Sequence, residues 1–540
     1  MSSQVALPHI PDHLSIPQFI LEHQHAIRPS RSGDSAWIIE DATGKRVGYD
    51  ETTLLQSGQP IDWGELSRIC HSYFAHIKSF TFCLCRPSNP AYTVDELVYQ
   101  LDLTKAKLII TSSAVMEIAF AAARKVGLGP DRIVLLTPEA SQHCTIDSLV
   151  KEGLAQKHQF RERILAPGEA KTKLAILSFS SGTTGKPKAV AIPHYAVIAN
   201  IIQMAAHQQG RMRPGDVVGA DSPCLILRGK HELKSWPNQI IILTIRQGTI
   251  VVIEKFSFVP FLESITRHRI THLCLVPPHI VLLCKHPATK NYDLGHVKWV
   301  MAGAAPLSAE LTTQLVKVIP NAGIGQGYGM TETCTSISMY PPSQKIGTIG
   351  SAGQVLPGIE MKVIKEDGEL AGPGEPGELM VRGPSNALGY FKNEKAWVRT
   401  GDEVIVKGDR ELFIVDRLKE IMKVNGSQVA PAELEGLLLD HPDIADVCVV
   451  GIPDEFSGEV PLAYVVIAAN TLERVKSDAQ ALNKLKTNIM QYVAEHKISY
   501  KHVKEVEFIP NIPKNPSGKL LRRVLRDMAK ASRETRKARL

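Results

Sequence analysis

The sequence predicts a multidomain α/β protein: a large amino-terminal α/β body with a β-rich subdomain, followed by a small carboxy-terminal α+β domain. Three observations support this fold class. The 540 residues are too many for one compact core, and at 44% hydrophobic they are too apolar for a disordered chain. Short runs rich in Val and Ile alternate with longer helix-like stretches. After about Gly347, turns with glycine and proline, rather than helix-like stretches, separate the apolar runs.

The expected elements follow in chain order. In the body we expect strands at 107–111, 132–136, 174–177, 248–253 and 272–276. In the β-rich region we expect strands at 358–364, 377–383 and 411–416. The last region has the pattern of a helix at 431–439, strands at 446–452 and 462–469, and a helix at 478–497. These patterns divide the chain into an amino-terminal domain, 1–416, and a carboxy-terminal domain, 417–540.

The charge distribution argues against a nucleic-acid-binding protein. The formal net charge of +7 lies in residues 519–540, where nine Lys or Arg face one Asp and one Glu, so the remaining chain is neutral. A nucleic-acid footprint needs a basic stripe on folded surface, whereas this tail is expected to be a solvated basic helix. No run approaches the roughly 18 apolar residues of a membrane-spanning helix, so no integral membrane segment is expected.

The cysteines point to a reducing compartment. The nine Cys are scattered and form no CxxC pair, so neither a zinc ribbon nor a disulfide framework is indicated. We expect reduced thiols in an intracellular protein.

The segment 178–188, SFSSGTTGKPK, has the composition of a phosphate-binding loop and follows the expected strand 174–177. Its hydroxyls can bind phosphate oxygens, its glycines let backbone N–H groups turn toward a ligand, and its lysines supply charge. The GxxxxGK[ST] pattern of nucleoside triphosphatases is absent. Taken alone, the segment fits an ordinary Ser/Gly surface turn equally well. The candidate binding residues are Ser180, Ser181, Gly182, Thr183, Thr184, Gly185, Lys186, Pro187 and Lys188.

Four further motifs decide between these readings. They are GQGYGMTET (325–333), RTGD (399–402), VDRLKEIMKVNG (415–426) and NPSGK (515–519). In this order and at this spacing, together with SSGTTGKPK, they resemble the adenylate-forming superfamily of acyl-CoA synthetases, peptide-synthetase adenylation domains and beetle luciferases. Within that superfamily the chain is most similar to 4-coumarate:CoA ligases and fungal acyl-CoA ligases.

The resemblance implies an ATP-dependent acyl- or aryl-CoA ligase of fungal-type secondary metabolism. Such an enzyme activates a carboxylic acid as an acyl-adenylate and passes the acyl group to CoA, with Mg²⁺ as cofactor. Two alternatives stay open. One is adenylation with transfer to a carrier protein, which would use the same ATP motifs. The other is a catalytically impaired relative kept for binding.

The resemblance also implies roles for individual residues. The 180–188 loop would hold the β- and γ-phosphates, Thr331 would contact the α-phosphate and Glu332 would ligate Mg²⁺. Asp402 would accept the ribose hydroxyls, with Arg417 as a second ribose contact. The adenine and acyl sites would be lined by Ala304, Gln326, Gly327 and Tyr328.

The small domain is implied to be mobile, because two half-reactions share one cleft. Lys519, in NPSGK, matches the catalytic lysine of the family and would neutralise charge between the carboxylate and the α-phosphate. The hinge and the loop presented to CoA would contain Lys419, Lys423, Gly426 and Gln428.

Three segments depart from the family pattern, and one of them is 389–402, which is shortened before its aspartate. Between 75 and 88 the family has another helix and strand, so a core strand is expected to be missing here. In 225–247 a charged stretch replaces the acyl-pocket motif, and His231 is out of register with the expected histidine. Burying such charges unpaired costs several kcal/mol, so we expect this segment to face solvent or to be poorly ordered, and we expect acid affinity to be poor.

The last three residues, Ala538, Arg539 and Leu540, fit the small, basic, leucine form of a peroxisomal address. The sequence therefore predicts recognition by the peroxisomal import receptor, with a cytoplasmic location as the alternative.

Overall fold

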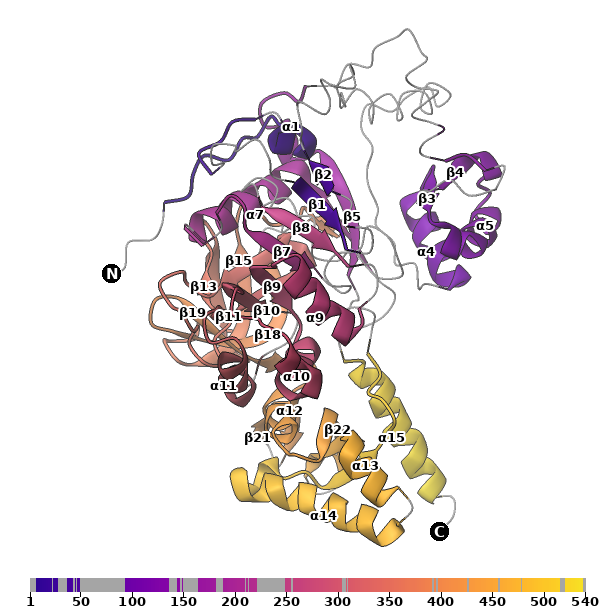
Figure 1. Cartoon of the computed structure of the whole chain (residues 1–540), viewed down its shortest axis with the longest axis vertical. Coiled ribbons are helices and arrows are strands. Elements are labelled where there is room, and N and C mark those ends of the chain that lie inside the picture. Colours follow the sequence, from indigo (N-terminus) through magenta and orange to yellow (C-terminus); the bar gives the residue numbers. More distant parts are fainter. Residues whose placement is uncertain are drawn as a thin grey trace.

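The computed structural model of the 540-residue chain (Figure 1) describes most of the body and nearly all of the small domain. The described residues are 6–21, 23–27, 36–41, 44, 46–48, 93–135, 143–145, 148, 164–180, 188–208, 210–211, 213–220, 248–253, 256–303, 307, 309–390, 393–394, 397–424, 427–454, 457–476, 478–514 and 520–537. The segments 75–88 and 225–247 lie outside these residues, and with them the expectations of a missing strand and of a charged segment turned to solvent or poorly ordered.

One mixed sheet organises the body. Its parallel half runs in the order β11 (Gly323–Met330), β10 (Trp299–Ala302), β9 (His272–Leu275), β7 (Val217–Ala220), β8 (Thr249–Val252) and β1 (Ala36–Glu40). Its antiparallel half continues from β11 through β12 (Thr335–Met339), β13 (Gln354–Val355), β19 (Glu411–Arg417), β18 (Val398–Lys407), β15 (Pro376–Arg382) and β14 (Glu360–Ile364). A short edge strand, β2 (Arg46–Gly48), pairs with β1. The α/β body and its β-rich extension are therefore confirmed.

Three amphipathic helices cover one face of the parallel strands. They are α9 (Phe258–Arg267), α10 (Pro277–Lys285) and α11 (Ala309–Val318). Phe261, Leu283 and Leu315 have almost no exposed surface and pack in one cluster with the strand residues Leu273 and Val300. Burial of such side chains contributes roughly 1.5–3 kcal/mol each, so this layer anchors the strands that carry the site.

The helix α7 (His194–His207) lies at the centre of the body. Every residue except Tyr195 is buried, as expected of a helix that is apolar all round. Its polar side chains bind backbone of the antiparallel half: Asn200 Nδ2 donates to Ser336 O (2.9 Å) and Gln203 Nε2 to Pro357 O (2.8 Å). These bonds satisfy the buried amides and tie α7 to segments far along the chain.

The remaining elements of the body are smaller. A four-stranded sheet contains β5 (Leu174–Ser180), β6 (Lys188–Pro193), β16 (Gly389–Tyr390) and β17 (Asn393–Glu394). A separate unit, at the right of Figure 1, contains α4 (Val94–Thr104), β3 (Ile109–Thr111), α5 (Met116–Lys125) and β4 (Ile133–Leu135). The helix α1 (Ile16–Leu21) packs beside α7. Short 3₁₀ turns lie at 113–115, 130–132, 169–171, 287–291, 331–333 and 499–501.

The small domain is a sheet between helices. The strands are β20 (Met422–Val424), β21 (Ser427–Val429), β22 (Ile444–Asp454), β23 (Gly458–Ile467) and β24 (Glu505–Phe508), and the helices are α12 (Pro431–Leu439), α13 (Ala469–Val475), α14 (Ala479–His496) and α15 (Arg522–Lys537). Alternate residues of β22 point to opposite faces: Val447 and Val449 pack with α12 and α14, whereas Cys448 and Val450 pack with α15. The expected α+β domain is confirmed.

The basic terminal helix is only partly solvated, contrary to expectation. Arg522, its first residue, is almost fully buried and forms ion pairs with Glu420 and, at 2.6 Å, with Glu435. Arg533 pairs with Glu505 at 2.5 Å. The net charge of the segment could not predict these contacts, because it does not distinguish a basic residue that has a buried acidic partner from one that is in water. Within the described residues, no helix combines the length and apolarity needed to cross a bilayer.

Polar contacts join the body to the small domain in this arrangement, and four of them lie between the body and residues 423–440. Asp416 Oδ2 accepts the backbone N–H of Ala432 at 3.0 Å, and Lys423 Nζ donates to Glu366 Oε1 at 2.9 Å. Lys285 Nζ, at the end of α10, donates to the carbonyl of Leu439 at 2.6 Å. The fourth contact brings together the carboxyl groups of Glu310, on α11, and Asp440, at the end of α12. All four are polar, so the domains share no apolar core through them.

Candidate active site

The motif GQGYGMTE forms a strand rather than a loop. Residues 323–330 make up β11, at the junction between the parallel and antiparallel halves of the sheet. A Cβ on Gly325 would overlap the ring of Tyr340, and one on Gly329 would overlap the carbonyl of Thr335. These two glycines are required for close packing, so they do not themselves indicate a phosphate-binding turn.

The second half of β11 lies where open α/β sheets bind ligands. Gln326 pairs with Ala302, the last residue of β10, so Gly327 and Tyr328 extend beyond the carboxyl end of the parallel strands. The side chain of Gln326 accepts the backbone N–H of Leu307 at 2.8 Å, which holds the chain after β10 against β11. Ala304, expected beside it, lies outside the described residues.

Tyr328, Asp402 and Arg417 form a charged cluster at this position. The hydroxyl of Tyr328 donates to Asp402 Oδ2 at 2.6 Å, and Arg417 Nε lies 3.3 Å from Asp402 Oδ1. Asp402 and Arg417 are paired neighbours on β18 and β19, which explains why RTGD and VDRLKE come together. The side chain of Asp402 is 7% exposed, so it is a buried carboxylate. Its two donors are the neutral hydroxyl of Tyr328 and the charged guanidinium of Arg417.

The ionisation of this cluster follows from burial. Removal from water, reinforced by the negative charge of Asp402, raises the pKa of Tyr328 well above its usual range, so the phenol keeps its proton and remains a donor. The backbone also fixes Asp402: its N–H donates to Thr400 Oγ1 at 3.1 Å, and that hydroxyl donates to Leu379 O at 2.9 Å. The cluster can receive the hydroxyl groups of a ligand through the carboxylate.

Thr331 and Glu332 follow directly, in a 3₁₀ turn after β11. The carbonyl of Glu332 accepts the N–H of Ala387 at 2.9 Å, which joins this turn to the segment that precedes β16. Among the described residues, no group of three or more His, Cys, Asp or Glu could hold a metal. A single carboxylate fits Mg²⁺, which is commonly held by one or two carboxylates together with substrate phosphates and water.

The expected phosphate loop is shorter than the sequence indicated. Residues 178–180 belong to β5 and Lys188 begins β6, with Ser180 paired to Lys188. The expectation that the loop begins at Ser178 was therefore wrong, because hydroxyl side chains fit a paired strand as well as a turn. Ser181, Gly182, Thr183, Thr184, Gly185, Lys186 and Pro187 lie outside the described residues.

Two of the residues expected to face CoA, Lys423 and Gln428, lie on the hairpin β20–β21. Lys423 pairs with Gln428 across it, and the Lys423 ammonium is bound to Glu366 of the body. Lys419 lies in the turn between β19 and β20. Gly426 and the expected catalytic residue Lys519 lie outside the described residues. In this arrangement the partner of the Lys423 ammonium in the body is therefore Glu366, which is not one of the expected site residues.

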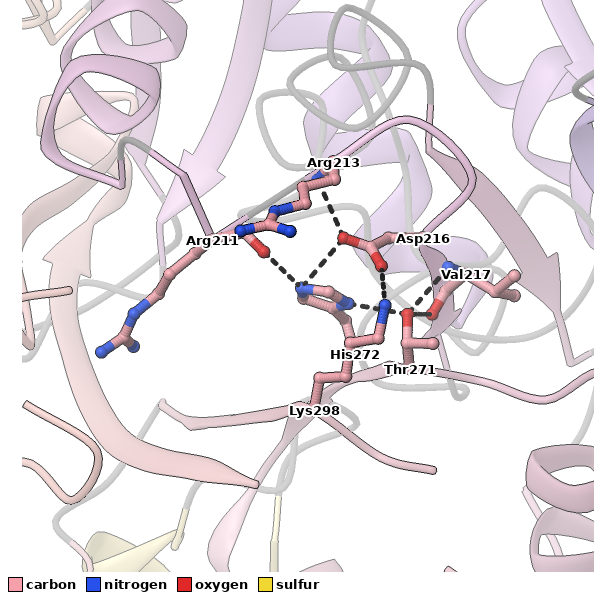
Figure 2. A network of polar contacts seen from close by, with 7 residues as sticks. All are labelled: Arg211, Arg213, Asp216, Val217, Thr271, His272 and Lys298. Atoms are coloured by element: carbon pink, nitrogen blue, oxygen red, sulfur yellow. Dashed lines mark hydrogen bonds and ion pairs between the residues drawn. The ribbon is translucent and has the colours of Figure 1, made fainter. Parts of the chain in front are cut away.

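A second polar network lies at the opposite edge of the sheet (Figure 2). Buried His272 lies with Nε2 3.8 Å from Asp216 Oδ2 and 3.3 Å from the carbonyl of Arg211, while Lys298 Nζ donates to Asp216 Oδ1 at 2.8 Å. Burial lowers the pKa of His272, which favours the neutral ring. These residues precede or begin β7, β9 and β10, so they lie at the amino ends of the strands. Ligands bind at the carboxyl ends, so we assign this network a structural role.

Sequence reasoning missed the bond between Tyr328 and Asp402. The two residues are 74 positions apart, and both were expected near the nucleotide, but neither motif contains a local pattern that pairs them. Only the order of the strands, with β11 and β18 in one sheet, brings them together.

A large α/β body with an acceptor carboxylate at the carboxyl edge of its sheet, joined directly to a small α+β domain, has the architecture of nucleotide-dependent adenylate-forming enzymes. The chain belongs to the AMP-binding enzyme family: the AMP-binding enzyme model matches residues 83–391, and the model for the C-terminal domain of that family matches residues 433–519.

Curated relatives agree with this assignment. The chain is 34% identical to 4-coumarate–CoA ligase 3 of Arabidopsis thaliana, over 96% of this chain and 92% of the relative. It is 33% identical to 4-coumarate–CoA ligase 1 of Petroselinum crispum, over 96% of this chain and 94% of the relative.

Solved structures share the fold at low sequence identity. The anthranilate CoA ligase AuaEII in complex with anthranoyl-AMP superposes with a TM-score of 0.79 at 19% identity, covering 97% of this chain and 99% of that one. A benzoate CoA ligase from Burkholderia xenovorans LB400 gives a TM-score of 0.74 at 18% identity, covering 95% and 100%. The fold class expected from the sequence is thereby confirmed.

Proposed function

We propose that this protein is an ATP- and Mg²⁺-dependent acyl- or aryl-CoA ligase that forms AMP. The observation that carries the proposal is the cluster of Asp402, Arg417 and Tyr328 at the carboxyl edge of the sheet, in a chain of the AMP-binding enzyme family. The similarity to 4-coumarate–CoA ligases along 96% of the chain supports an acid as one substrate and CoA as the other.

The chemistry has two balanced steps. A carboxylate oxygen of the acid attacks the α-phosphorus of ATP and expels pyrophosphate, which turns a poor electrophile into an acyl-adenylate. The thiol of CoA, after losing its proton, then attacks the acyl carbon, and AMP leaves with the electron pair of the broken C–O bond. The first step is mainly a matter of positioning and neutralising charge, so it needs fixed cations and donors.

The residues of the five motifs divide this work between them. Asp402 accepts the ribose hydroxyls and Arg417 holds that carboxylate in place. Gln326, Gly327 and Tyr328 line the adenine side, and Thr331 contacts the α-phosphate from the turn that follows. Glu332 holds Mg²⁺, which supplies positive charge to the phosphate oxygens when bound. Lys519, from the small domain, contributes the cation between the reacting oxygen and phosphorus.

The acid is proposed to be aromatic, medium-chain or a polyketide product, as in secondary metabolism. The names of the related ligases, which act on 4-coumarate, anthranilate and benzoate, favour an aromatic acid as the first to test. The C-terminal Ala538–Leu540 tripeptide supports a peroxisomal location. A fluorescent amino-terminal fusion should enter peroxisomes, and a fusion lacking Leu540 should not; a cytosolic full-length fusion would refute the location.

The test is to incubate the full chain with ATP, Mg²⁺, CoA and a panel of carboxylic acids, and to measure AMP and thioester separately. AMP with thioester in equal amounts supports the proposal. Acid-dependent pyrophosphate exchange without thioester would replace CoA by another acceptor, such as a carrier-protein thiol. If no acid supports exchange and the protein binds no nucleotide, the enzyme proposal fails and a binding role takes its place.

A further inference from the structure

We propose that the hydroxyl of Tyr328 is a positioning group that orients Asp402 and thereby makes the site select a nucleotide with an intact ribose diol. The inference rests on the proposed function and deepens it. It assigns to Tyr328 a role beyond lining the adenine side of the site, since the ring lines the site whether or not the hydroxyl is present.

The geometry carries the inference. The phenol oxygen lies 2.6 Å from Asp402 Oδ2, a short distance typical of a hydroxyl that donates to a charged oxygen. Arg417 approaches the other oxygen, Oδ1, from the neighbouring strand at 3.3 Å. The two carboxylate oxygens are thus held by separate donors, one from β11 and one from β19. With both ends held, the plane of the carboxylate cannot rotate freely.

A fixed plane matters because a vicinal diol needs two acceptor directions at once. An ionised carboxylate offers about four acceptor positions, so it can receive a phenol, a guanidinium and the two hydroxyls of a ribose. If the carboxylate rotates, it can keep its hydrogen bond to one ribose hydroxyl, but it loses the hydrogen bond to the other. We therefore expect the Tyr328 hydroxyl to strengthen binding of ribonucleotides far more than that of deoxyribonucleotides.

The surroundings keep Tyr328 in the donor state. Burial in the sheet raises the pKa of the phenol well above its usual range. At neutral pH the phenol therefore keeps its proton, and Asp402 is the ionised member of the pair. The backbone of Tyr328 is paired with Ser338 of β12, and the first half of β11 is paired with β10. The hydroxyl is therefore preorganised before the nucleotide arrives.

The experiment compares Tyr328→Phe with the wild-type chain, because this change removes only the hydroxyl. Binding of AMP and of 2′-deoxy-AMP is measured by calorimetry on the full chain, and the kcat and KM for ATP and 2′-deoxy-ATP are measured by pyrophosphate exchange. We expect AMP affinity to fall about 10-fold, with 2′-deoxy-AMP affinity nearly unchanged. The KM for ATP should rise while kcat changes little.

Tyr340→Phe is the matched control. Tyr340 is a buried tyrosine directly after β12, and it lies beside Gly323 and Arg211 at the other end of β11 from Tyr328. It should leave the ratio of AMP to 2′-deoxy-AMP affinity at the wild-type value. Thermal unfolding of both variants shows whether the fold is retained.

The outcomes are distinguishable. A folded, active Tyr328→Phe variant with the wild-type ratio of ribonucleotide to deoxyribonucleotide affinity would overturn this inference and leave the proposed function intact. Equal losses for both nucleotides would also overturn it, since the hydroxyl would then serve the adenine side or the fold. A wild-type chain that binds neither AMP nor ATP would instead refute the proposed function.

Discussion

Asp216 shows how a single buried carboxylate can stabilise the edge of a sheet. It accepts the N–H of Arg213 at 2.8 Å and the ammonium of Lys298, and it lies beside the neutral ring of His272. Asp216→Ala should lower the free energy of unfolding by about 1–3 kcal/mol, because the Arg213 N–H and the Lys298 ammonium lose their acceptor. Denaturant unfolding followed by circular dichroism measures the change.

Lys298→Met provides the comparison. Its side chain is 61% exposed, so its ion pair with Asp216 is worth at most about 1 kcal/mol. If the two variants are destabilised equally, the ion pair with Lys298 stabilises this edge, and the hydrogen bond from the Arg213 N–H contributes little. If neither variant affects nucleotide binding, the structural assignment of this network stands.

Lys519 and Gly426 should separate the two half-reactions. Lys519→Ala should reduce adenylation by roughly 10² to 10³, because a preorganised cation is lost, and affect thioester formation much less. Gly426→Trp should spare adenylation and block access of CoA. Pyrophosphate exchange, run beside the reaction of synthetic acyl-adenylate with CoA, measures each step. Equal losses of both steps in Lys519→Ala would contradict the division of roles.

At the level of elements, Arg522 decides how α15 is attached. Its guanidinium binds Glu435 of α12 and Glu420 of the turn after β19, and all three side chains are mostly buried. Arg522→Ala leaves two buried carboxylates without their cation and should destabilise the small domain by about 3–5 kcal/mol. Arg523→Ala is the control: this side chain is 83% exposed and pairs only weakly with Asp527, so we expect little change.

The measurement is thermal unfolding combined with hydrogen exchange of α15. Faster exchange in α15 and β22 of the Arg522 variant alone would support the attachment, since Leu525 of that helix packs in one cluster with Cys448 and Val450 of the strand. Similar exchange in both variants would show that apolar packing alone holds the helix.

Periodicity predicted many of the elements of the body and the small domain. The helix expected at 431–439 is α12 with the same bounds, and the strands expected at 272–276 and 411–416 are β9 and β19 to within one residue. The apolar residues of these elements recur with the period of a helix or a strand, so the local sequence predicts them. The end of β5 was missed because Ser178–Ser180 look like a loop until their partner, β6, is known.

The relative placement of the strands could not be predicted. The motifs predicted that Asp402, Arg417 and Tyr328 belong to one site, through resemblance to a family. The hydrogen bond between Tyr328 and Asp402, and the pairing of Glu310 with Asp440, depend on sheet order and on domain placement. Such contacts join residues more than 70 positions apart, and no local pattern encodes them.

At the scale of the whole molecule, one carboxyl pair makes the domain arrangement sensitive to pH. Burial and the neighbouring Glu310 raise the pKa of Asp440 to about 7, from an ordinary value of 3.8, while Lys285 acts in the opposite direction. Tyr492 of α14 also lies nearby, and its own pKa is raised. The joined arrangement therefore binds a proton that separated domains bind only below about pH 4.

Proton linkage determines whether the domain contact weakens or strengthens as pH rises. Because the joined state holds more protons between pH 4 and 7, the contact is strongest at the acidic end of that window and weakens as pH rises through about 7. Small-angle scattering from pH 5.5 to 8.5 should show a more extended chain at the alkaline end. Asp440→Asn, which mimics the protonated acid, should remain joined throughout, and the same expansion in this variant would contradict the assignment.

The buried helix α7 has a consequence for biosynthesis. Its polar side chains bind backbone that is made much later, since Asn200 and its partner Ser336 are 136 residues apart. At about 5–20 residues per second, a ribosome needs about 7–27 s to bridge that gap. During this interval β5 and β6 can pack against this helix, but the side that packs against β12 has no strand to cover it. We expect nascent chains arrested before Ser336 to bind chaperones through 194–207, and chains extended beyond Val355 to release them, which pull-down of arrested ribosomes can test.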